Sequence, residues 1–375
     1  MLSFTPGQKI EKKLKDLQGL VVESCGKLED MSDNEKKYVH HCAFISSIGA
    51  STRIENAILT DQEIDWVDST LSADGKPSAF EEKKAIILDK LSKDRERSVE
   101  EVAGCRDILS MVYLQSTEMV PLSETVIRGL HHELLRYYPA ALKYAGSYKD
   151  APNRVVAVDH QTGKESIVLD PAPPGIITDT AMADLVGWYN GMVQKHPWPL
   201  LVAVEFVFRF LAIHPFRDGN GRLGRALFLL VLLQSDDSYL ARIVPYISID
   251  RQIERNRPLY YSVLHQGSDG RFESDPEKYN YEPVTWFFLK IFESALADIA
   301  VYRLRYADLR QLSETAMAVL ETFKSNPERR LKVADVAEIT GLPRRTIQYA
   351  LRTLVNKQFL QILGRGAGTR YQLVF

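Results

Sequence analysis

The sequence HPFRDGNGRLGR, residues 214 to 225, joins two strongly apolar segments of the chain. Before it, every position from Leu200 to Ile213 is apolar except Glu205 and Arg209, which are four residues apart and can pair on one helix face. After it, the segment from Arg222 to Leu233 is again largely apolar. Helices that are apolar nearly all round lie in the centre of a domain, so we predict two buried helices joined by a polar loop.

The first half of the loop offers a base beside an anion site. Pro215 stops the first helix and leaves His214 at its end, and histidine is the side chain best suited to accept a proton near neutral pH. Gly219 and Gly221 allow a sharp turn, which brings their N–H groups to the start of the second helix. Free N–H donors and the helix dipole favour an anion at that point.

The second half of the loop adds charge. Arg222 and Arg225 are three residues apart, so we expect both to project toward the same anion. Asp218 is an oxygen ligand of the kind that Mg²⁺ takes when it also holds phosphates. Taken singly, a histidine at a helix end or two nearby glycines are more often structural. Together, at the junction of two buried helices, these residues have no evident packing purpose.

This stretch resembles the Fic signature H-x-F-x-D-G-N-G-R-x-x-R and matches every fixed position, and the resemblance extends from about Thr117 to Ala300. It implies an all-α fold and transfer of AMP from ATP to a protein hydroxyl, with His214 as the base and Asp218 as the ligand of Mg²⁺. Without the resemblance, Tyr260 and Tyr261 would be interpreted as core aromatics. The positions that it assigns to ATP binding are Glu55, Phe216, Gly219, Asn220, Gly221, Arg222, Arg225, Tyr260 and Tyr261.

A β-hairpin is predicted before the loop. Val155 to Val158 and Ile167 to Leu169 are short apolar runs around a polar turn. In Fic proteins such a hairpin is a flap that docks the target by strand addition. The residues that would form the docking edge are Val156, Val158, Ile167 and Val168.

An inhibitory motif is predicted upstream. Ser51, Glu55 and Asn56 fit the pattern [S/T]-x-x-x-E-[G/N] that one class of Fic proteins carries, in which the glutamate pairs with the second arginine of the loop, here Arg225. A carboxylate and a phosphate would then compete for one guanidinium. The alternative is a capping box from Thr52 to Glu55 at the start of an ordinary helix. The same glutamate could instead support a hydrolase that removes AMP from a modified protein.

Other reactions stay open within the resemblance. Doc toxins run a kinase reaction with a similar loop, but they lack the second glycine and the last arginine that stand here as Gly221 and Arg225. Transfer of phosphocholine or UMP is not excluded by the loop.

The C-terminal segment resembles a winged helix-turn-helix. A helix followed by a turn is predicted over Val333 to Pro343, a second helix at Arg344 to Asn356, and strands at Phe359 to Leu363 and Arg370 to Val374. From Ile339 onward the sequence contains no acidic residue and six basic ones. This charge favours a DNA partner, and a DNA-binding regulator with a nucleotide-sensing core is the rival to an enzyme. A module that binds protein or joins two subunits is the alternative. The basic residues are Arg344, Arg345, Arg352, Lys357, Arg365 and Arg370.

The bulk properties favour a soluble, cytoplasmic, multidomain protein. The chain has 375 residues, a net charge of −2 and three widely spaced cysteines, so neither a disulfide framework nor a membrane partner is expected. No signal peptide is recognised. We predict a helical region at 1–116, with a loop at Leu71 to Pro77 and a charged helix from Phe80 to about Arg97, then a catalytic core at 117–300 and a winged helix at 301–375. The Fic resemblance, and not the composition, implies the partners: ATP, a protein target or the chain itself, and a second copy in a homodimer.

Overall fold

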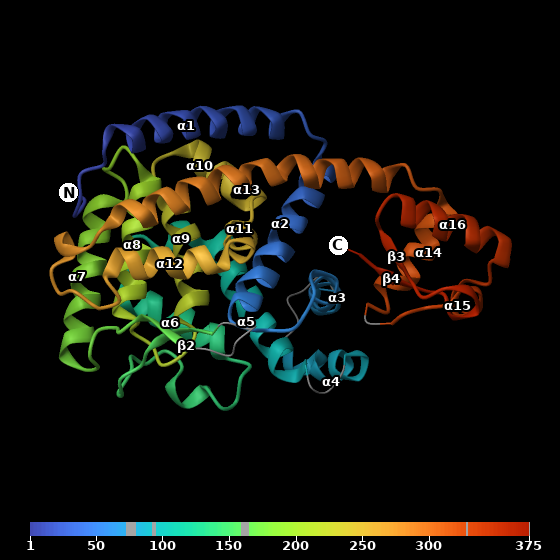
Figure 1. Cartoon of the computed structure of the whole chain (residues 1–375), viewed down its shortest axis with the longest axis horizontal. Helices are drawn as coiled ribbons and strands as arrows, with labels where there is room; N and C mark the ends of the chain where they lie inside the picture. The colour runs from blue at the N-terminus through green and yellow to red at the C-terminus, as the bar shows by residue number, and fades with distance from the viewer. Residues whose placement is uncertain (73–79, 92–94, 159–164, 328, 375) are drawn as a thin grey trace. The chain divides into compact units, whose positions relative to one another are not determined.

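The computed structural model describes residues 1–72, 80–91, 95–158, 165–327 and 329–374. Over these ranges the chain is mainly helical, and its strands form two small antiparallel hairpins (Figure 1). The predicted all-α class with a hairpin flap and a C-terminal winged helix is therefore confirmed. Within the same ranges, no helix is both long enough and apolar enough to cross a bilayer.

The chain forms two compact units. Unit 1 consists of Met1–Ala57 and Glu100–Ile299, and unit 2 consists of Ile58–Val99 and Ala300–Phe375. Because each unit combines segments that are far apart in the sequence, the three consecutive regions 1–116, 117–300 and 301–375 remain a prediction.

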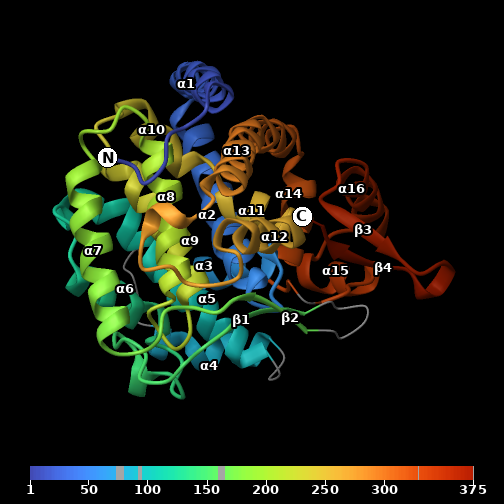
Figure 2. The same cartoon turned by 60° about the vertical axis from the view of Figure 1, so that its left-hand side comes forward.

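Two buried helices occupy the centre of unit 1, as the apolar segments predict. They are α8 (Pro199–Ile213) and α9 (Asn220–Gln234), which pack on each other. Figure 2 shows α7 (Ile176–Met192) beside α8. Helices that lie wholly in this unit also include α1 (Gln8–Glu29), α2 (Asp33–Ile54), α6 (Glu124–Leu135), α10 (Ser238–Ile243), α11 (Ile249–Arg255) and α12 (Arg257–Ser268).

The ion pair predicted inside α8 is present and is covered by the N-terminus. Arg209 lies 3.3 Å from Glu205, and both side chains are buried. The N–H and hydroxyl groups of Ser3 donate to the same carboxylate at 3.0 and 2.6 Å. Burying a carboxylate requires such partners, so the first residues of the chain are tied to the central helix.

The predicted hairpin is confirmed as β1 (Val155–Val158) and β2 (Glu165–Leu169), and its turn at 159–164 lies outside the described residues. The strands are antiparallel with Val156 opposite Ile167, and both side chains are exposed. On the other side, β2 packs on α12, where Nδ1 of His265 bonds the carbonyl oxygen of Val168 at 3.0 Å.

One helix prediction in the N-terminal region is wrong. The segment from Phe80 to Arg97 contains the whole of one helix, α4 (Phe80–Lys90), and the first residues of another, α5 (Glu96–Gln115). Each buries apolar positions of its own, such as Ile87 in α4 and Val99 in α5. Helix α3 (Asp61–Ser72) precedes them, and the loop expected at Leu71 to Pro77 falls largely outside the described residues.

The C-terminal part of unit 2 follows the predicted winged helix closely. Its core of buried apolar side chains includes Phe323, Leu351 and Phe359. The strands pair antiparallel with Leu360 opposite Leu373. The elements are α14 (Glu314–Lys324), α15 (Val333–Thr340), α16 (Arg344–Asn356), β3 (Leu360–Leu363) and β4 (Arg370–Leu373). Helix α13 (Tyr281–Arg310) precedes them, and its residues up to Ile299 belong to unit 1.

The packing of α6 on α5 can be tested by substituting two glycines. A Cβ on Gly104 of α5 would lie 2.0 Å from the carbonyl oxygen of Leu134, whereas one on Gly129 would meet nothing within 4 Å. We expect Gly104→Ala to cost about 1–3 kcal/mol of unfolding free energy, since backbone would have to move. Gly129→Ala, in an exposed helix interior, should gain about 0.5–1 kcal/mol. Urea unfolding of both variants measures the difference, and equal midpoints would contradict the close approach of α5 and α6.

Candidate active site

The loop between α8 and α9 begins and ends in left-handed backbone. His214 has φ 50° and ψ 57°, and its N–H donates to the carbonyl oxygen of Phe210 at 2.9 Å, which closes the last turn of α8. Gly219 has φ 79° and caps the start of α9. A left-handed histidine is strained and persists only where surrounding contacts fix it.

Asn220 and Phe216 close the loop from inside. The Asn220 side-chain oxygen accepts from the Phe216 N–H at 2.9 Å, and its NH₂ donates to the Phe216 carbonyl at 2.7 Å. Phe216 is buried and stacks on His131 at 3.7 Å between ring centroids. Both residues therefore build the loop, and the ATP contacts that the resemblance assigns to them remain predictions.

Sequence reasoning missed His131 of α6. Its Nδ1 accepts from the Gly146 N–H at 2.9 Å, so Nε2 carries the proton and donates to the Asp218 carbonyl at 2.9 Å. Burial lowers the pKa of His131 to about 4, which keeps this arrangement at neutral pH. A histidine on an amphipathic helix gives no local signal of such a role.

His214 has the protonation that a base requires. Its Nδ1 lies 3.3 Å from the Leu211 carbonyl, which can only accept, so Nδ1 carries the proton and Nε2 keeps its lone pair. Burial, together with the positive charge of Lys149, lowers the pKa of His214 to about 4. The ring is therefore neutral near pH 7 and can take up a proton.

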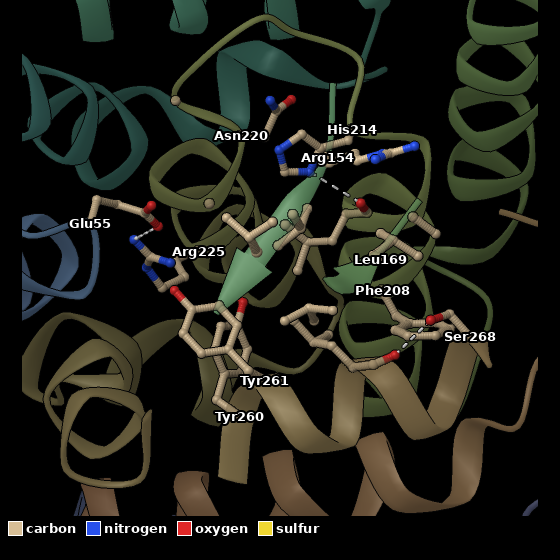
Figure 3. A pocket seen from close by; sticks show the side chains of 18 of the residues that line it. Glu55, Arg154, Leu169, Phe208, His214, Asn220, Arg225, Tyr260, Tyr261 and Ser268 are labelled. Carbon is tan, nitrogen blue, oxygen red and sulfur yellow. Dashed lines mark hydrogen bonds and ion pairs between the residues drawn. The ribbon is translucent and has the colours of Figure 1, made fainter. Parts of the chain in front are cut away.

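A cavity of about 260 Å³ opens over the loop. Its walls come from both strands of the hairpin, the C-terminal part of α8, the loop and α12 (Figure 3). Tyr260 and Tyr261 lie in the wall between the charged end, at Arg225, and an apolar end at Phe208. The structure therefore brings most of the predicted site residues to one cavity. Those that line it are Glu55, Val156, Val168, His214, Asp218, Gly219, Asn220, Gly221, Arg225, Tyr260 and Tyr261.

Arg225 is the buried centre of the charged end. Its side chain is 2% exposed, and Glu55 lies 3.1 Å from Nη2 (Figure 3). Ser51 accepts from the same guanidinium twice, through Oγ at 3.1 Å and the carbonyl oxygen at 2.7 Å. The contact predicted between the inhibitory motif and the second arginine is thus present.

A second carboxylate, which the sequence did not reveal, also holds Arg225. Asp250 of α11 lies 2.9 Å from Nε, and its side chain is 2% exposed. Burial raises the pKa of Asp250, while the adjacent guanidinium opposes that rise. A buried cation needs such a counter-charge, and Asp250 supplies it from a position 25 residues further along the chain.

The end of α2 presents Glu55 to the cavity. Glu55 caps this helix, and Asn56 follows in left-handed backbone with its side-chain oxygen 2.9 Å from Arg257. Thr52 donates back to Ile48 and Gly49, so the segment ends a helix and the capping-box alternative is wrong. A Cβ on Gly221 would lie 2.2 Å from Oε1 of Glu55, so a side chain there would displace the carboxylate from its present position.

Arg222 lies elsewhere than its spacing predicted. It is 2% exposed and does not line the cavity; it pairs with Asp218 at 3.3 Å and Glu101 at 3.8 Å. Three buried N–H-bearing atoms of the two arginines have no hydrogen-bond partner among the described residues, namely Nε and Nη1 of Arg222 and Nη1 of Arg225. Donors left in this state are costly unless an anion meets them.

Asp218 fits a magnesium site that a substrate completes. Its carboxylate lines the cavity, is 37% exposed and accepts from the Gly219 N–H at 2.6 Å. The described residues contain no group of three or more His, Cys, Asp or Glu side chains that could hold a metal. One carboxylate is what Mg²⁺ takes from a protein when phosphates and water provide the other ligands.

Comparison with known protein families places this loop in a known family of domains. The Fic/DOC family matches residues 121–232, which include the whole loop from His214 to Arg225. Residues 121–232 form a Fic/DOC family domain. The IclR helix-turn-helix domain matches residues 314–362, in agreement with the winged helix.

Relatives of the Fic domain are distant. Protein adenylyltransferase fic-1 from Caenorhabditis briggsae is 29% identical over 100 residues, which is 27% of this chain and 18% of that protein. A Fic family protein from Desulfovibrio desulfuricans has a similar structure, with a TM-score of 0.56 at 20% identity, and the likeness covers 100% of this chain and 98% of that one. A Fic domain containing signaling protein from Bacteroides thetaiotaomicron gives 0.54 at 23%, covering 78% and 95%. These likenesses show the Fic fold.

The ion pairs that Asp250 and Glu254 of α11 form should differ sharply in their contribution to the unfolding free energy. Asp250→Ala leaves the buried Arg225 short of a counter-charge, so we expect a loss of about 3–5 kcal/mol of unfolding free energy. Glu254→Gln, four residues on, removes a partly exposed pair with Arg53 and should cost within about 1 kcal/mol. Urea unfolding of the wild type and both variants measures this. An equal effect would show that Asp250 is not the required counter-charge.

Proposed function

We propose that this protein transfers AMP from Mg²⁺-ATP to a hydroxyl of a protein, and that Glu55 restrains the reaction. The observation that carries the proposal is the charged end of the cavity. There, the buried Nη1 of Arg225, which has no hydrogen-bond partner among the described residues, the amides at the start of α9 and a neutral histidine surround one space. An ATP phosphate chain would satisfy those donors.

In this reaction His214 Nε2 takes the proton of the target hydroxyl. The hydroxyl oxygen attacks the α-phosphorus, the bond from that phosphorus to the bridging oxygen breaks, and pyrophosphate leaves. His214 is suited to the step because Nδ1 is held by the Leu211 carbonyl and the ring is neutral near pH 7.

Asp218 would hold the Mg²⁺ that accompanies ATP, and this ion would neutralise charge on the phosphates. The carboxylate is oriented for this by the Gly219 N–H and by Arg222. The aromatic wall at Tyr260 and Tyr261 would cover the nucleoside, and the exposed strand pair at Val156 and Ile167 would dock an extended target segment.

Glu55 would act by occupying Arg225. Its carboxylate lies where an outer phosphate of ATP would have to bind, 3.1 Å from the guanidinium and against Gly221. A phosphate and a carboxylate cannot both use the same N–H groups, so ATP would bind with its phosphates displaced from the productive position.

We expect Glu55→Gly to raise AMP transfer by about tenfold or more, since Arg225 then becomes free for phosphate. Glu55→Gly/His214→Ala should lose about a hundredfold or more of that activity, because the base is gone. Intact-protein mass spectrometry after incubation with Mg²⁺-ATP, alone and with candidate targets, detects the adduct of AMP.

The matched control is Glu254→Gln. The Glu254 side chain of α11 pairs with Arg53 near the end of α2 but lies outside the cavity. Equal transfer by the wild type and Glu55→Gly would exclude the inhibitory role. Release of AMP from a modified target by the wild type, lost in Glu55→Gly, would favour the hydrolase instead.

The C-terminal domain supports DNA binding as a second function. Arg344 and Arg345 begin α16 and are exposed, although cations at a helix N-terminus are unfavourable unless an anion is bound nearby. Arg352 and the 73% exposed Tyr349 extend the same surface. Lys357 differs from the prediction, since it pairs inside the unit with Asp308 at 2.6 Å.

We expect the protein to bind duplex DNA with an affinity that falls as salt rises. Arg345→Ala and Arg352→Ala should each weaken binding about tenfold, because they remove exposed cations from α16. Lys357→Gln, which changes a cation already paired, is the control and should change binding little. Fluorescence anisotropy with a labelled duplex measures all three, and binding that ignores both arginines would exclude α16 as the contact surface.

A further inference from the structure

Lys149 and Asn153 lie against the loop that begins at His214. Both precede β1 in the chain, and Lys149 is 4% exposed. The Lys149 Nζ atom donates to the Asn153 side-chain oxygen at 2.8 Å, so the two side chains form one hydrogen-bonded unit. Neither residue belongs to the cavity wall or to the sequence motif discussed above.

This unit binds four consecutive carbonyl groups of the loop. Lys149 donates from Nζ to Ile213 at 3.0 Å and from its backbone N–H to Pro215 at 2.8 Å. Asn153 donates from Nδ2 to His214 at 3.3 Å and to Phe216 at 2.9 Å. The carbonyls bound by Lys149 and by Asn153 alternate along the chain, so the backbone is fixed on both sides of the histidine.

The loop needs such support because α8 ends there. Carbonyl groups at the end of a helix have no partner within it, and buried ones must find a partner elsewhere. His214 also carries the strain of a left-handed backbone, which the surrounding contacts must fix. Four fixed carbonyls hold the residue without touching its imidazole ring.

The charge of Lys149 also acts on His214. Among the groups that influence the ring electrostatically, Lys149 is positive, while Glu55 and Asp218 are negative. Burial lowers the pKa of Lys149 to about 8, so the ammonium form still predominates at pH 7. A positive charge here opposes protonation of the imidazole.

We propose that Lys149 and Asn153 are positioning residues for His214: together they clamp the carbonyls of residues 213–216, and the Lys149 ammonium keeps the imidazole available as a proton acceptor. This role rests on the proposed function of His214 as the base. The clamp itself is a property of the fold and can be tested separately.

The kinetic test uses Glu55→Gly as the parent and adds Lys149→Met, Lys149→Arg or Asn153→Ala. Lys149→Met should lower kcat for AMP transfer about tenfold or more, with KM for ATP changed by less than about twofold. The rate at pH 5 relative to that at pH 8 should also fall by about threefold, because without the nearby cation His214 is protonated at higher pH. Lys149→Arg should keep the parent pH profile.

Asn153→Ala should lower kcat without changing the pH profile, because it removes hydrogen bonds but no charge. Lys143→Met changes an exposed lysine six residues upstream and is the control for loss of a charge. A Lys149→Met enzyme with an unchanged pH profile would overturn the electrostatic role. A rise in KM for ATP that accounts for the whole loss would overturn the positioning role.

Hydrogen–deuterium exchange tests the clamp without catalysis. Amides of residues 214–221 should exchange about tenfold faster in Lys149→Met and Asn153→Ala than in Lys143→Met. Unchanged exchange would overturn the clamp even if AMP transfer is observed. Faster exchange with no AMP transfer by the Glu55→Gly parent would support the clamp and reject the proposed function of the site.

Discussion

The burial of one positive charge, that of Arg225, determines much of the architecture around the site. A guanidinium that is 2% exposed in the middle of α9 is costly unless carboxylates and carbonyls surround it. Asp250 brings α11 to this point, while Ser51 and Glu55 bring the end of α2. Three helices from distant parts of the sequence therefore converge on one side chain. Because Nη1 of Arg225 still has no partner among the described residues, the same arrangement leaves a donor for a ligand.

In the loop between α8 and α9, side chains from other segments satisfy buried backbone polar groups. Two helices buried on all sides can be joined in the domain interior only if every polar group of the connection finds a partner. Asn220 closes the loop from within, His131 holds the Asp218 carbonyl, and Lys149 with Asn153 binds the other side. The imidazole of His214 and the carboxylate of Asp218 are left to face the cavity. In the proposed reaction this division separates the groups that hold the backbone from those that meet the substrate.

The sequence predicts what depends on local pattern and misses what depends on distant contacts. Apolar periodicity was sufficient for α8, α9 and the winged helix, and the spacing of the motif placed His214, Asp218 and Arg225 at one cavity. Asp250 and His131 could not be found in this way, because each lies on an ordinary helix and meets the loop only through the tertiary fold. Arg222 shows the limit of spacing arguments. Residues three apart differ by about 60° around a helix, and inside a packed core this leaves Arg222 paired with Asp218 and Glu101 and outside the cavity wall.

The two carboxylates on Arg225 differ in a way that bears on how a phosphate could replace one of them. The Asp250 side chain is 2% exposed, whereas the Glu55 side chain is 33% exposed. Rehydration on leaving is easier for the more exposed Glu55, so in the proposed function an incoming anion would exchange with Glu55 while Asp250 continues to hold the guanidinium. The backbone around Glu55 is secured on both sides, by the double hydrogen bond from Arg53 to Glu254 and by the contact of Asn56 with Arg257. Exchange by rotation of the glutamate side chain leaves all of these contacts intact, and unwinding of α2 would break them. For the proposed restraint, the geometry therefore favours an action through one side chain on a helix end that stays in place.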